Sequence, residues 1–396
     1  MSDDKKPAIR FKNYSDDWEQ RKLGDVVQIT MGQSPDGSTY SDEPSDYILV
    51  QGNADLQNGW VCPRIWTTQI TKKADAGDLI MSVRAPAGAM GKTAYNAVIG
   101  RGVAAIKGNE FIYQLLVKMD MDGFWKTLSC GSTFESLNSN NIKNAEVKVP
   151  ITAEQVQIGN FFQQLDNLIT LQHRKYDKLQ NLKKAMLEKM FPKNGSNVPE
   201  IRFKGFTDDW EQRKFSEGVS EIGDGLHGTP IYCEDGNIYF INGNNLVDGK
   251  IVISAETKKV NESQQSIADK SLDDTTILMS INGTIGNLAY YSGERLMLGK
   301  SAAYIKVSEF DKRFVYAYLQ APSVQGYFMD SLTGTTIKNL GLKAIREMIM
   351  FIPQDVDEQK RIGKFFDYLD HLITLHQREL EKLKNVKKAM LEKMFV

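Results

Sequence analysis

The chain has 396 residues, and its 49 basic and 50 acidic side chains leave a formal net charge of −1. The length predicts two domains of ordinary size, and the balanced charge excludes a basic surface over the whole molecule, so DNA binding would need local clusters or a partner that supplies phosphate contacts. Three widely spaced cysteines exclude a disulfide framework. The absence of a signal-peptide pattern and of any apolar run near the roughly 20 residues that span a bilayer predicts a cytoplasmic protein.

The chain begins with a leader that is repeated later. Residues 7–23 (PAIRFKNYSDDWEQRKL) return at 199–215 (PEIRFKGFTDDWEQRKF), with 12 of 17 positions identical. Residues 155–191, which end in NLKKAMLEKMF, return at 359–395 with 24 of 37 positions identical. The segments between these copies hardly match. A repeated frame around two unlike inserts predicts a molecule that presents one partner surface twice and reads two different targets.

The two inserts are rich in β-branched and aromatic residues, with frequent Gly and Asn turns, which is typical of an α+β fold. DLIMSVRAPAGAMGKTAY aligns with TTILMSINGTIGNLAY, and the differences between the inserts concentrate in polar loops such as GQSPDGSTY and GDGLHGTP. Diverged loops on a shared scaffold predict two different recognition surfaces, although drift under relaxed constraint is the alternative. The expected boundaries are a leader at 1–23, an insert at 24–150, a long helix at 151–192, a second leader at 193–215, a second insert at 216–353 and a second long helix at 354–396.

The segment after each insert has the pattern of a long amphipathic helix. Apolar residues at steps of three and four form one stripe from Ile158 to Met190 and again from Ile362 to Met394, close to a coiled-coil seam. About 38 residues at 1.5 Å each make a rod of roughly 57 Å. We expect the two rods to pack antiparallel on each other, with the inserts at opposite ends and a pseudo-two-fold axis between the repeats. The alternative is that each helix covers only its own domain.

The helix starts and the charged faces of the helices add two further expectations. Thr152 with Gln155, and Asp355 with Glu358, have the spacing of a capping box. Basic clusters on the helices predict phosphate contact or docking of a large partner, with an ordinary solvated face as the alternative. The docking candidates are Lys183, Lys184, Lys387, Lys388 and the leader tryptophans Trp18 and Trp210, which could instead pack on their own domains.

Motifs for catalysis are absent from the sequence. GAMGKT at 88–93 lacks the first glycine of a phosphate-binding loop, because position 86 is Pro86. No adjacent prolines and no dinucleotide-type glycine fingerprint occur, so binding of S-adenosylmethionine is not expected. The four histidines have no metal-ligand spacing. We therefore expect a non-catalytic chain with no metal site and no cofactor of its own.

The leaders (IRFK…DDWEQRK) and helix ends (KKAMLEKMF) resemble those of the specificity subunits of type I restriction–modification systems, and the openings GQSPDGSTY and GDGLHGTP are similar to those of that family's target recognition domains. The resemblance covers essentially the whole chain. It implies two target recognition domains that are separated by antiparallel helices and read the halves of a gapped double-stranded DNA site. It also implies two docked methyltransferase subunits and two motor–endonuclease subunits, which would carry the S-adenosylmethionine, ATP and Mg²⁺.

For such a protein we expect polar loop residues to enter the major groove, where each base pair has a distinct pattern, and the helices to set the gap between half-sites. The partner would flip out and methylate an adenine in each half-site. Arg84 and Asn282 occupy aligned positions and give the most specific expectation for base contacts, because arginine commonly reads guanine and asparagine commonly reads adenine. The candidate DNA-binding residues are Gln33, Ser34, Ser38, Tyr40, Arg84, Lys92 and Arg101 in the first insert and His227, Thr229, Asn282, Thr284, Lys300, Thr335 and Lys338 in the second.

Two other functions are compatible with the sequence. A stand-alone DNA-binding regulator would use the same inserts without a methyltransferase, although its lack of net positive charge predicts weak non-specific affinity. A helical scaffold that joins two other proteins would bind no DNA.

Overall fold

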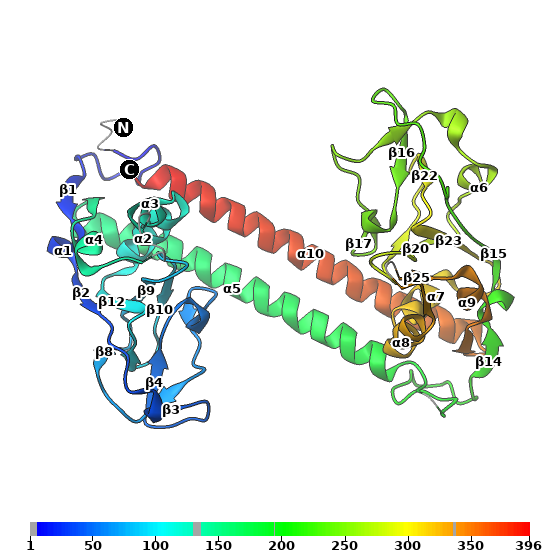
Figure 1. Ribbon diagram of the computed structural model, residues 1–396, viewed down its shortest axis with the longest axis horizontal. Helices are drawn as coiled ribbons and strands as arrows, with labels where there is room; N and C mark the ends of the chain where they lie inside the picture. Colours follow the sequence, from blue (N-terminus) through cyan, green and yellow to red (C-terminus); the bar gives the residue numbers. More distant parts are fainter. Residues whose placement is uncertain (1–5, 130–135, 194, 336–337) are drawn as a thin grey trace. The chain divides into compact units, whose positions relative to one another are not determined.

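The computed structural model describes residues 6–129, 136–193, 195–335 and 338–396, and the chain divides into two compact units. Unit 1 is Met1–Arg174 together with His376–Val396, and unit 2 is Lys175–Leu375. Each unit therefore contains one leader, one insert, the first part of the helix that follows that insert and the last part of the other long helix. In Figure 1 the red end of α10 accordingly lies beside the blue leader of unit 1.

The first insert is built on two sheets. The larger sheet has the order β2-β12-β9-β10-β6-β5 and the second has the order β3-β7-β4-β11-β8. The strands of the first sheet are β2 (Gln28–Met31), β12 (Val103–Lys107), β9 (Leu79–Ser82), β10 (Met90–Lys92), β6 (Trp60–Val61) and β5 (Leu56–Gln57). Those of the second are β3 (Tyr40–Ser41), β7 (Trp66–Thr67), β4 (Tyr47–Val50), β11 (Ala97–Ile99) and β8 (Lys72–Ala74). The helices of the insert are α1 (Leu23–Val26), α2 (Glu110–Met121), α3 (Phe124–Ser129) and α4 (Ser139–Lys143), and leader strand β1 (Glu19–Lys22) pairs with β13 (Glu146–Val149).

The second insert repeats the main features of the first with different details. Its principal sheet has the order β15-β23-β20-β21, and a smaller sheet has the order β19-β16-β22. These strands are β15 (Val219–Asp224), β23 (Ala302–Val307), β20 (Thr276–Ser280), β21 (Leu288–Tyr290), β19 (Lys259–Val260), β16 (Ile238–Ile241) and β22 (Leu296–Leu298). Two-stranded pairs are β14 (Glu211–Lys214) with β26 (Ile349–Ile352), β17 (Leu246–Val247) with β18 (Lys250–Ile251), and β24 (Leu332–Thr333) with β25 (Asn339–Leu340). The helices are α6 (Ile267–Lys270), α7 (Lys312–Leu319), α8 (Pro322–Asp330) and α9 (Leu342–Glu347).

The central strands β9 and β20 occupy matching places in the two inserts. Every residue of each strand is buried, which explains the apolar runs LIM in β9 and ILM in β20, since a strand that is covered on both faces has no polar side. β9 pairs antiparallel with β12 and β10, and β20 pairs antiparallel with β23 and β21. The alignment of the inserts that the sequence suggests is therefore correct for these strands.

The two long helices are α5 (Thr152–Lys189) and α10 (Val356–Met394). In the core of unit 1, Phe162 from the start of α5 packs on Phe395, just beyond the end of α10, with 5.7 Å between ring centroids. In unit 2 the same contact recurs between Phe366 of α10 and Phe191 after α5, at 5.6 Å. The alternative in which each helix covers only its own insert is therefore wrong, because each core contains the end of the other helix region.

Polar contacts within each unit show the relative direction of the helix segments. In unit 1, Lys387 Nζ lies 2.6 Å from Asp166 Oδ1, and nearer the middle of the helices His376 Nδ1 lies 2.8 Å from Gln172 Oε1. Advancing along α5 thus corresponds to retreating along α10, so the two segments run in opposite directions. In unit 2, Lys183 of α5 pairs with Asp370 of α10 at 2.5 Å.

The capping boxes that the sequence predicts are only partly present. Thr152 already lies in the first turn of α5, and the side chain of Gln155 donates to the carbonyl of Pro150 at 2.9 Å. Asp355 does accept from the N–H of Asp357 at 2.8 Å, but Glu358 pairs with the leader instead of completing a box.

Among the residues that the structure describes, no helix is long and apolar enough to cross a membrane.

Candidate nucleic-acid interface

Three loops of the first insert meet at one end of the larger sheet, where strands β2 and β9 end and β12 begins. The N–H of Gln33, which follows β2, donates to the carbonyl of Ile99 at 2.8 Å, and the N–H of Arg101 donates to Ser34 Oγ at 3.1 Å. On the other side of this turn, the N–H of Val83 donates to the carbonyl of Gly102 at 2.8 Å. These bonds bring together the group that we name edge 1, which consists of Gln33, Ser34, Arg84 and Arg101.

The second insert forms the same arrangement. The N–H of Lys300 donates to the carbonyl of Leu226 at 2.9 Å, and Asn282 Nδ2 donates to the carbonyl of Lys300 at 3.2 Å. The backbone of Asn282 also forms a bridge with Asn339. These contacts bring together the group that we name edge 2, which consists of His227, Asn282, Lys300 and Lys338.

Close approach of the backbones explains one glycine in each of these loops. A Cβ atom on Gly32 would lie 2.1 Å from the carbonyl oxygen of Gly100, and one on Gly225 would lie 2.0 Å from that of Leu298. Both distances are far below van der Waals contact, so any side chain would push the loop away from the turn. The packing of each loop on its turn thus requires glycine at position 32 in GQSPDGSTY and at position 225 in GDGLHGTP.

Arg84 and Asn282 occupy equivalent positions in the two edges. Each lies two residues beyond the last residue of a central strand, Ser82 in β9 and Ser280 in β20. Ser82 is paired with Val103 and Ser280 with Ala302. The sequence alignment of this pair is therefore correct, and the Arg84 side chain is exposed while that of Asn282 is half-buried.

The structure separates Lys92 from edge 1. Lys92 Nζ lies 2.9 Å from Glu110 Oε2, and its side chain is only 12% exposed. The ring centroids of Trp60 and Tyr113 lie 5.1 and 4.6 Å from the same nitrogen. The surroundings of Lys92 hold it inside the insert, which leaves little of this side chain for a phosphate or a base.

Ser38 and Tyr40 hold their own loop. Ser38 donates from its backbone N–H and its hydroxyl to Asp36 Oδ1, at 2.9 and 2.7 Å, and these bonds lower the pKa of the Asp36 carboxyl. The hydroxyl of Tyr40 donates to the carbonyl of Pro35 at 3.2 Å. Both residues therefore stabilise the loop conformation.

Five of the candidates of the second insert, two of which belong to edge 2, lie on exposed loops. His227 Nε2 lies 2.8 Å from Asp224 Oδ2, and Thr229 and Thr284 are exposed. Thr335 and Lys338 are also exposed, on either side of residues 336–337, which lie outside the described residues.

The docking candidates divide into buried and exposed groups. Trp18 and Trp210 are each 2% exposed and belong to the cores of their own units, so these side chains are not surface anchors. Lys183 and Lys387 are occupied by their ion pairs across the helix segments. Lys184 and Lys388, the neighbouring residues, are exposed and occupy matching positions in the repeat, so of these six residues only they offer a repeated basic surface.

The ion pairs that hold the leaders have no counterpart among the residues that the sequence motifs predict. Arg10 forms two bonds of 2.7 Å with the Glu154 carboxylate, and Arg202 forms bonds of 2.6 and 2.8 Å with Glu358. Each bond to the carboxylate raises the pKa of its arginine, against the opposing effect of burial. The repeated IRF triplet in the leaders, combined with Glu at the same place in both helices, is the signal that could have found them.

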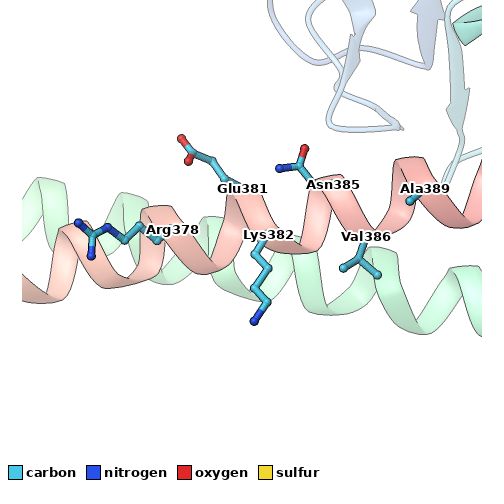
Figure 2. A pocket seen from close by; sticks show the side chains of 6 residues that line it. All are labelled: Arg378, Glu381, Lys382, Asn385, Val386 and Ala389. Carbon is cyan, nitrogen blue, oxygen red and sulfur yellow. The ribbon is translucent and has the colours of Figure 1, made fainter. Parts of the chain in front are cut away.

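The described residues contain no cluster with the composition of a metal site. Among them no group of three or more His, Cys, Asp or Glu side chains could hold a metal ion. Figure 2 shows one of the surface hollows, whose lining residues all come from α10. Glu381 and Asn385 point to one side of the helix there and Lys382 to the other, an arrangement without a paired nucleophile and base.

Comparisons with known proteins agree on one family. The family model for the type I restriction modification DNA specificity domain matches this chain twice, over residues 15–181 and 207–385. Two type I restriction enzyme specificity subunits of Methanocaldococcus jannaschii align along nearly the whole chain. The MjaIX subunit is 23% identical, with 96% of this chain and 92% of that protein covered, and the MjaVIII subunit is 20% identical, with coverages of 95% and 91%. A putative specificity subunit of the same organism, MjaX, is 29% identical over 182 residues, which cover 43% of this chain and 42% of that protein.

Solved structures have the same fold. The crystal structure of the type I restriction–modification S subunit from M. genitalium superimposes with a TM-score of 0.64 at 15% identity, with 99% of both chains covered. A chain from a structure described as showing complex assembly and conformational transition of the type I system gives a TM-score of 0.52 at 16% identity, with coverages of 96% and 97%. The repeated match of the family model over most of the chain shows that this protein belongs to the family of type I restriction–modification DNA specificity domains, as a specificity subunit.

Proposed function

We propose that this chain reads a gapped bipartite DNA site, with each insert reading one half. The observation that carries this proposal is that the same loop arrangement is built twice with different side chains. Edge 1 presents Arg84 and Arg101, whereas edge 2 presents Asn282 and Lys300. Arginine pairs best with guanine and asparagine with adenine in the major groove, so two such edges fit two different half-sites. The exposed loop residues Thr229, Thr284 and Thr335 extend the second surface.

The long helices set the gap between the half-sites. In this proposal α5 and α10 form an antiparallel two-helix coiled coil, and the repeats are related by a pseudo-two-fold axis that places the target recognition domains at opposite ends. The matched contacts Asp166–Lys387 and Asp370–Lys183 support it, because exchange of the repeats converts one pair into the other. Domains that bind one face of DNA favour half-site centres about one helical turn, roughly 34 Å, apart.

The chemistry belongs to partner subunits. Two methyltransferase subunits dock on the repeated regions, where the exposed Lys184 and Lys388 lie, and methylate an adenine in each half-site. Two motor–endonuclease subunits complete the restriction enzyme. S-adenosylmethionine, ATP and Mg²⁺ bind to these partners. This chain is non-catalytic and recognises the DNA sequence. Phosphate contacts from the partners would compensate for the net charge of −1.

The decisive experiment is co-expression of the chain with its candidate methyltransferase, followed by long-read mapping of N6-methyladenine in the host genome. A single gapped motif with one methylated adenine in each half is the expected result. A stable complex that binds DNA but adds no methylation would favour the stand-alone regulator. A chain that forms no DNA-binding complex under any salt condition would favour the helical scaffold.

A further inference from the structure

The loop between β15 and β16 holds an exposed isoleucine in a fixed position. Ile231 is 77% exposed, although the preceding Pro230 is buried. The N–H of Ile231 donates to Gln264 Oε1 and its carbonyl accepts from Gln264 Nε2, both at 2.8 Å. Because one side-chain amide holds both backbone groups of Ile231, the direction of the Ile231 Cα–Cβ bond is fixed as well.

Both ends of this loop are also held. Before it, Leu226 bonds to the turn that carries Lys300. After it, Tyr232 forms a bridge with Val260, and the N–H of Cys233 donates to the carbonyl of Lys259 at 2.9 Å. A loop that is ordered before binding loses little conformational freedom in a complex. Residues 227–231 are therefore presented in a ready-made conformation, with exposed side chains at His227, Thr229 and Ile231.

The first insert holds its loop in a similar way but presents different chemistry. The N–H of Asp36 donates to Gln69 Oε1 at 2.6 Å, so a glutamine side chain again fixes the loop backbone. The carboxylate of Asp36 is engaged by Ser38, and residues 33–40, all of which are described, include no exposed large aliphatic side chain. A partner that docks on both repeats would need the same surface twice. The exposed aliphatic residue nearest to this loop, Ile70, lies on the neighbouring segment between Gln69 and Thr71. Within the loop itself only the second insert carries an aliphatic group, which fits contact with a target that only this insert reads.

We propose that Ile231 contacts the 5-methyl group of a thymine in the half-site read by the second insert. This inference rests on the proposed function, because it requires the insert to enter the major groove. Thymine is the base that presents a methyl group there, beside acceptors that neighbouring polar side chains can bind. An exposed aliphatic residue between Thr229 and the start of β16, four residues after His227, matches this mixture of apolar and polar recognition.

The test is a double-mutant cycle between protein and DNA. After the methylated motif has been mapped, the complex of this chain with its methyltransferase is titrated with duplexes in which each thymine of the second half-site is replaced in turn by uracil, which lacks only the methyl group. The protein variants are Ile231→Ala and, as a control with an exposed aliphatic residue of the same insert, Val252→Ala; Val252 is 45% exposed.

The unmodified complex should bind one of the uracil duplexes about fourfold more weakly, as expected for loss of one buried methyl group. Ile231→Ala should weaken binding of the thymine duplex by at least this factor and should no longer distinguish thymine from uracil at that position. Val252→Ala should retain the discrimination.

Other outcomes overturn the inference. If Ile231→Ala discriminates uracil as the parent does at every thymine, or if the half-site has no thymine, Ile231 does not read a methyl group. If Ile231→Ala instead dissociates the methyltransferase, Ile231 belongs to a protein interface. In these cases the proposed function stands, whereas a complex that binds no specific DNA overturns both.

Discussion

Arg10 and Glu154 form a two-bond ion pair in which the carboxylate is completely buried and the arginine side chain is 12% exposed. The pair joins the leader to the first turn of α5, and the next backbone N–H toward the N-terminus, that of Ile9, donates to the carbonyl of Lys393 near the end of α10 at 2.9 Å. Unit 2 repeats both contacts through Arg202 and Ile201. Each leader thus connects the start of one long helix to the end of the other.

Removal of one partner of this pair should destabilise unit 1 strongly. Arg10→Ala leaves a buried carboxylate without its counterion, which typically costs about 3–5 kcal/mol. The free energy of unfolding is measured by urea denaturation, with far-UV circular dichroism and tryptophan fluorescence. The double variant Arg10→Met with Glu154→Leu should be milder than Arg10→Ala, because it leaves no unpaired charge.

The surface pair Lys6–Asp17 provides the matched control, since its side chains are 57% and 55% exposed. Lys6→Ala should change stability by about 0–1 kcal/mol. Equal effects of Lys6→Ala and Arg10→Ala would contradict the stabilising role assigned to the Arg10–Glu154 pair.

Substitutions at the two edges should alter one half of the DNA motif each. Arg84→Ala is expected to relax one position of the first half-site and to cost about 1–3 kcal/mol in specific binding, while Asn282→Ala should do the same in the second half-site alone. Methylation mapping of each variant complex gives the readout. Lys126→Ala, which removes an exposed cation from α3, should leave both half-sites unchanged. A variant at either edge that alters both half-sites, or neither, would contradict the assignment.

Lengthening both helices at the boundary between the units should lengthen the gap. Seven residues inserted after Arg174 and seven after Leu375 fall between the units, so the contacts within each unit remain. Seven residues add about 10.5 Å and nearly preserve the phase of the apolar stripe, which corresponds to roughly three base pairs at 3.4 Å each. Methylation mapping should show the same half-sites about three base pairs further apart. An unaltered gap in a methylating complex would show that the helices do not measure it.

The repeated lysines should determine how many methyltransferase subunits bind. Lys184→Glu or Lys388→Glu alone should weaken one of two docking sites, and the double variant should weaken both. Light scattering after size-exclusion chromatography measures the stoichiometry. Variants of the ion-paired neighbours, such as Lys183→Ala, should instead lower thermal stability, because Lys183 bonds to Asp370 and to Gln320. A double variant that still binds two partners would place the docking surface elsewhere.

The equivalent contacts of the two leaders also predict that the chain tolerates circular permutation. Nine residues separate Phe191 from Ile201, and direct fusion of Val396 to Met1 would place nine residues, Val396 and Met1–Ala8, between Phe395 and Ile9. A chain fused in this way and opened after Pro192 should fold and methylate the same motif. Loss of methylation with retained binding of partners, or an insoluble permuted chain, would show that the two connections are not interchangeable.

The repeat makes much of the fold predictable from the sequence. Contacts between segments that are distant in the sequence are not predictable in this way. The apolar stripe predicts both long helices, and the alignment of Arg84 with Asn282 is correct because buried central strands of similar sequence precede both residues. Glu358 had the spacing of a capping residue, yet it binds Arg202. A local pattern does not reveal a partner 156 residues away.

Side chains can also be misjudged when only their neighbours in sequence are known. Lys92 lies beside glycine turns and resembles a phosphate ligand in sequence. In the structure its ammonium group forms an ion pair with Glu110 and contacts two aromatic rings. Trp18 lies in a charged leader, yet it is buried against Phe111 and Phe395, which come from α2 and from the far end of the chain. Only the three-dimensional fold brings these residues together.

The packing of Phe395 on Trp18 has a consequence for synthesis on the ribosome. Unit 2 is one continuous stretch, Lys175–Leu375, whereas unit 1 also needs His376–Val396. The insert that emerges first must therefore wait until the last segment of α10 is made, roughly 10 to 45 s later at ordinary translation rates. Its aromatic core stays open during that interval, so the half of the molecule that is translated first is the last to be completed.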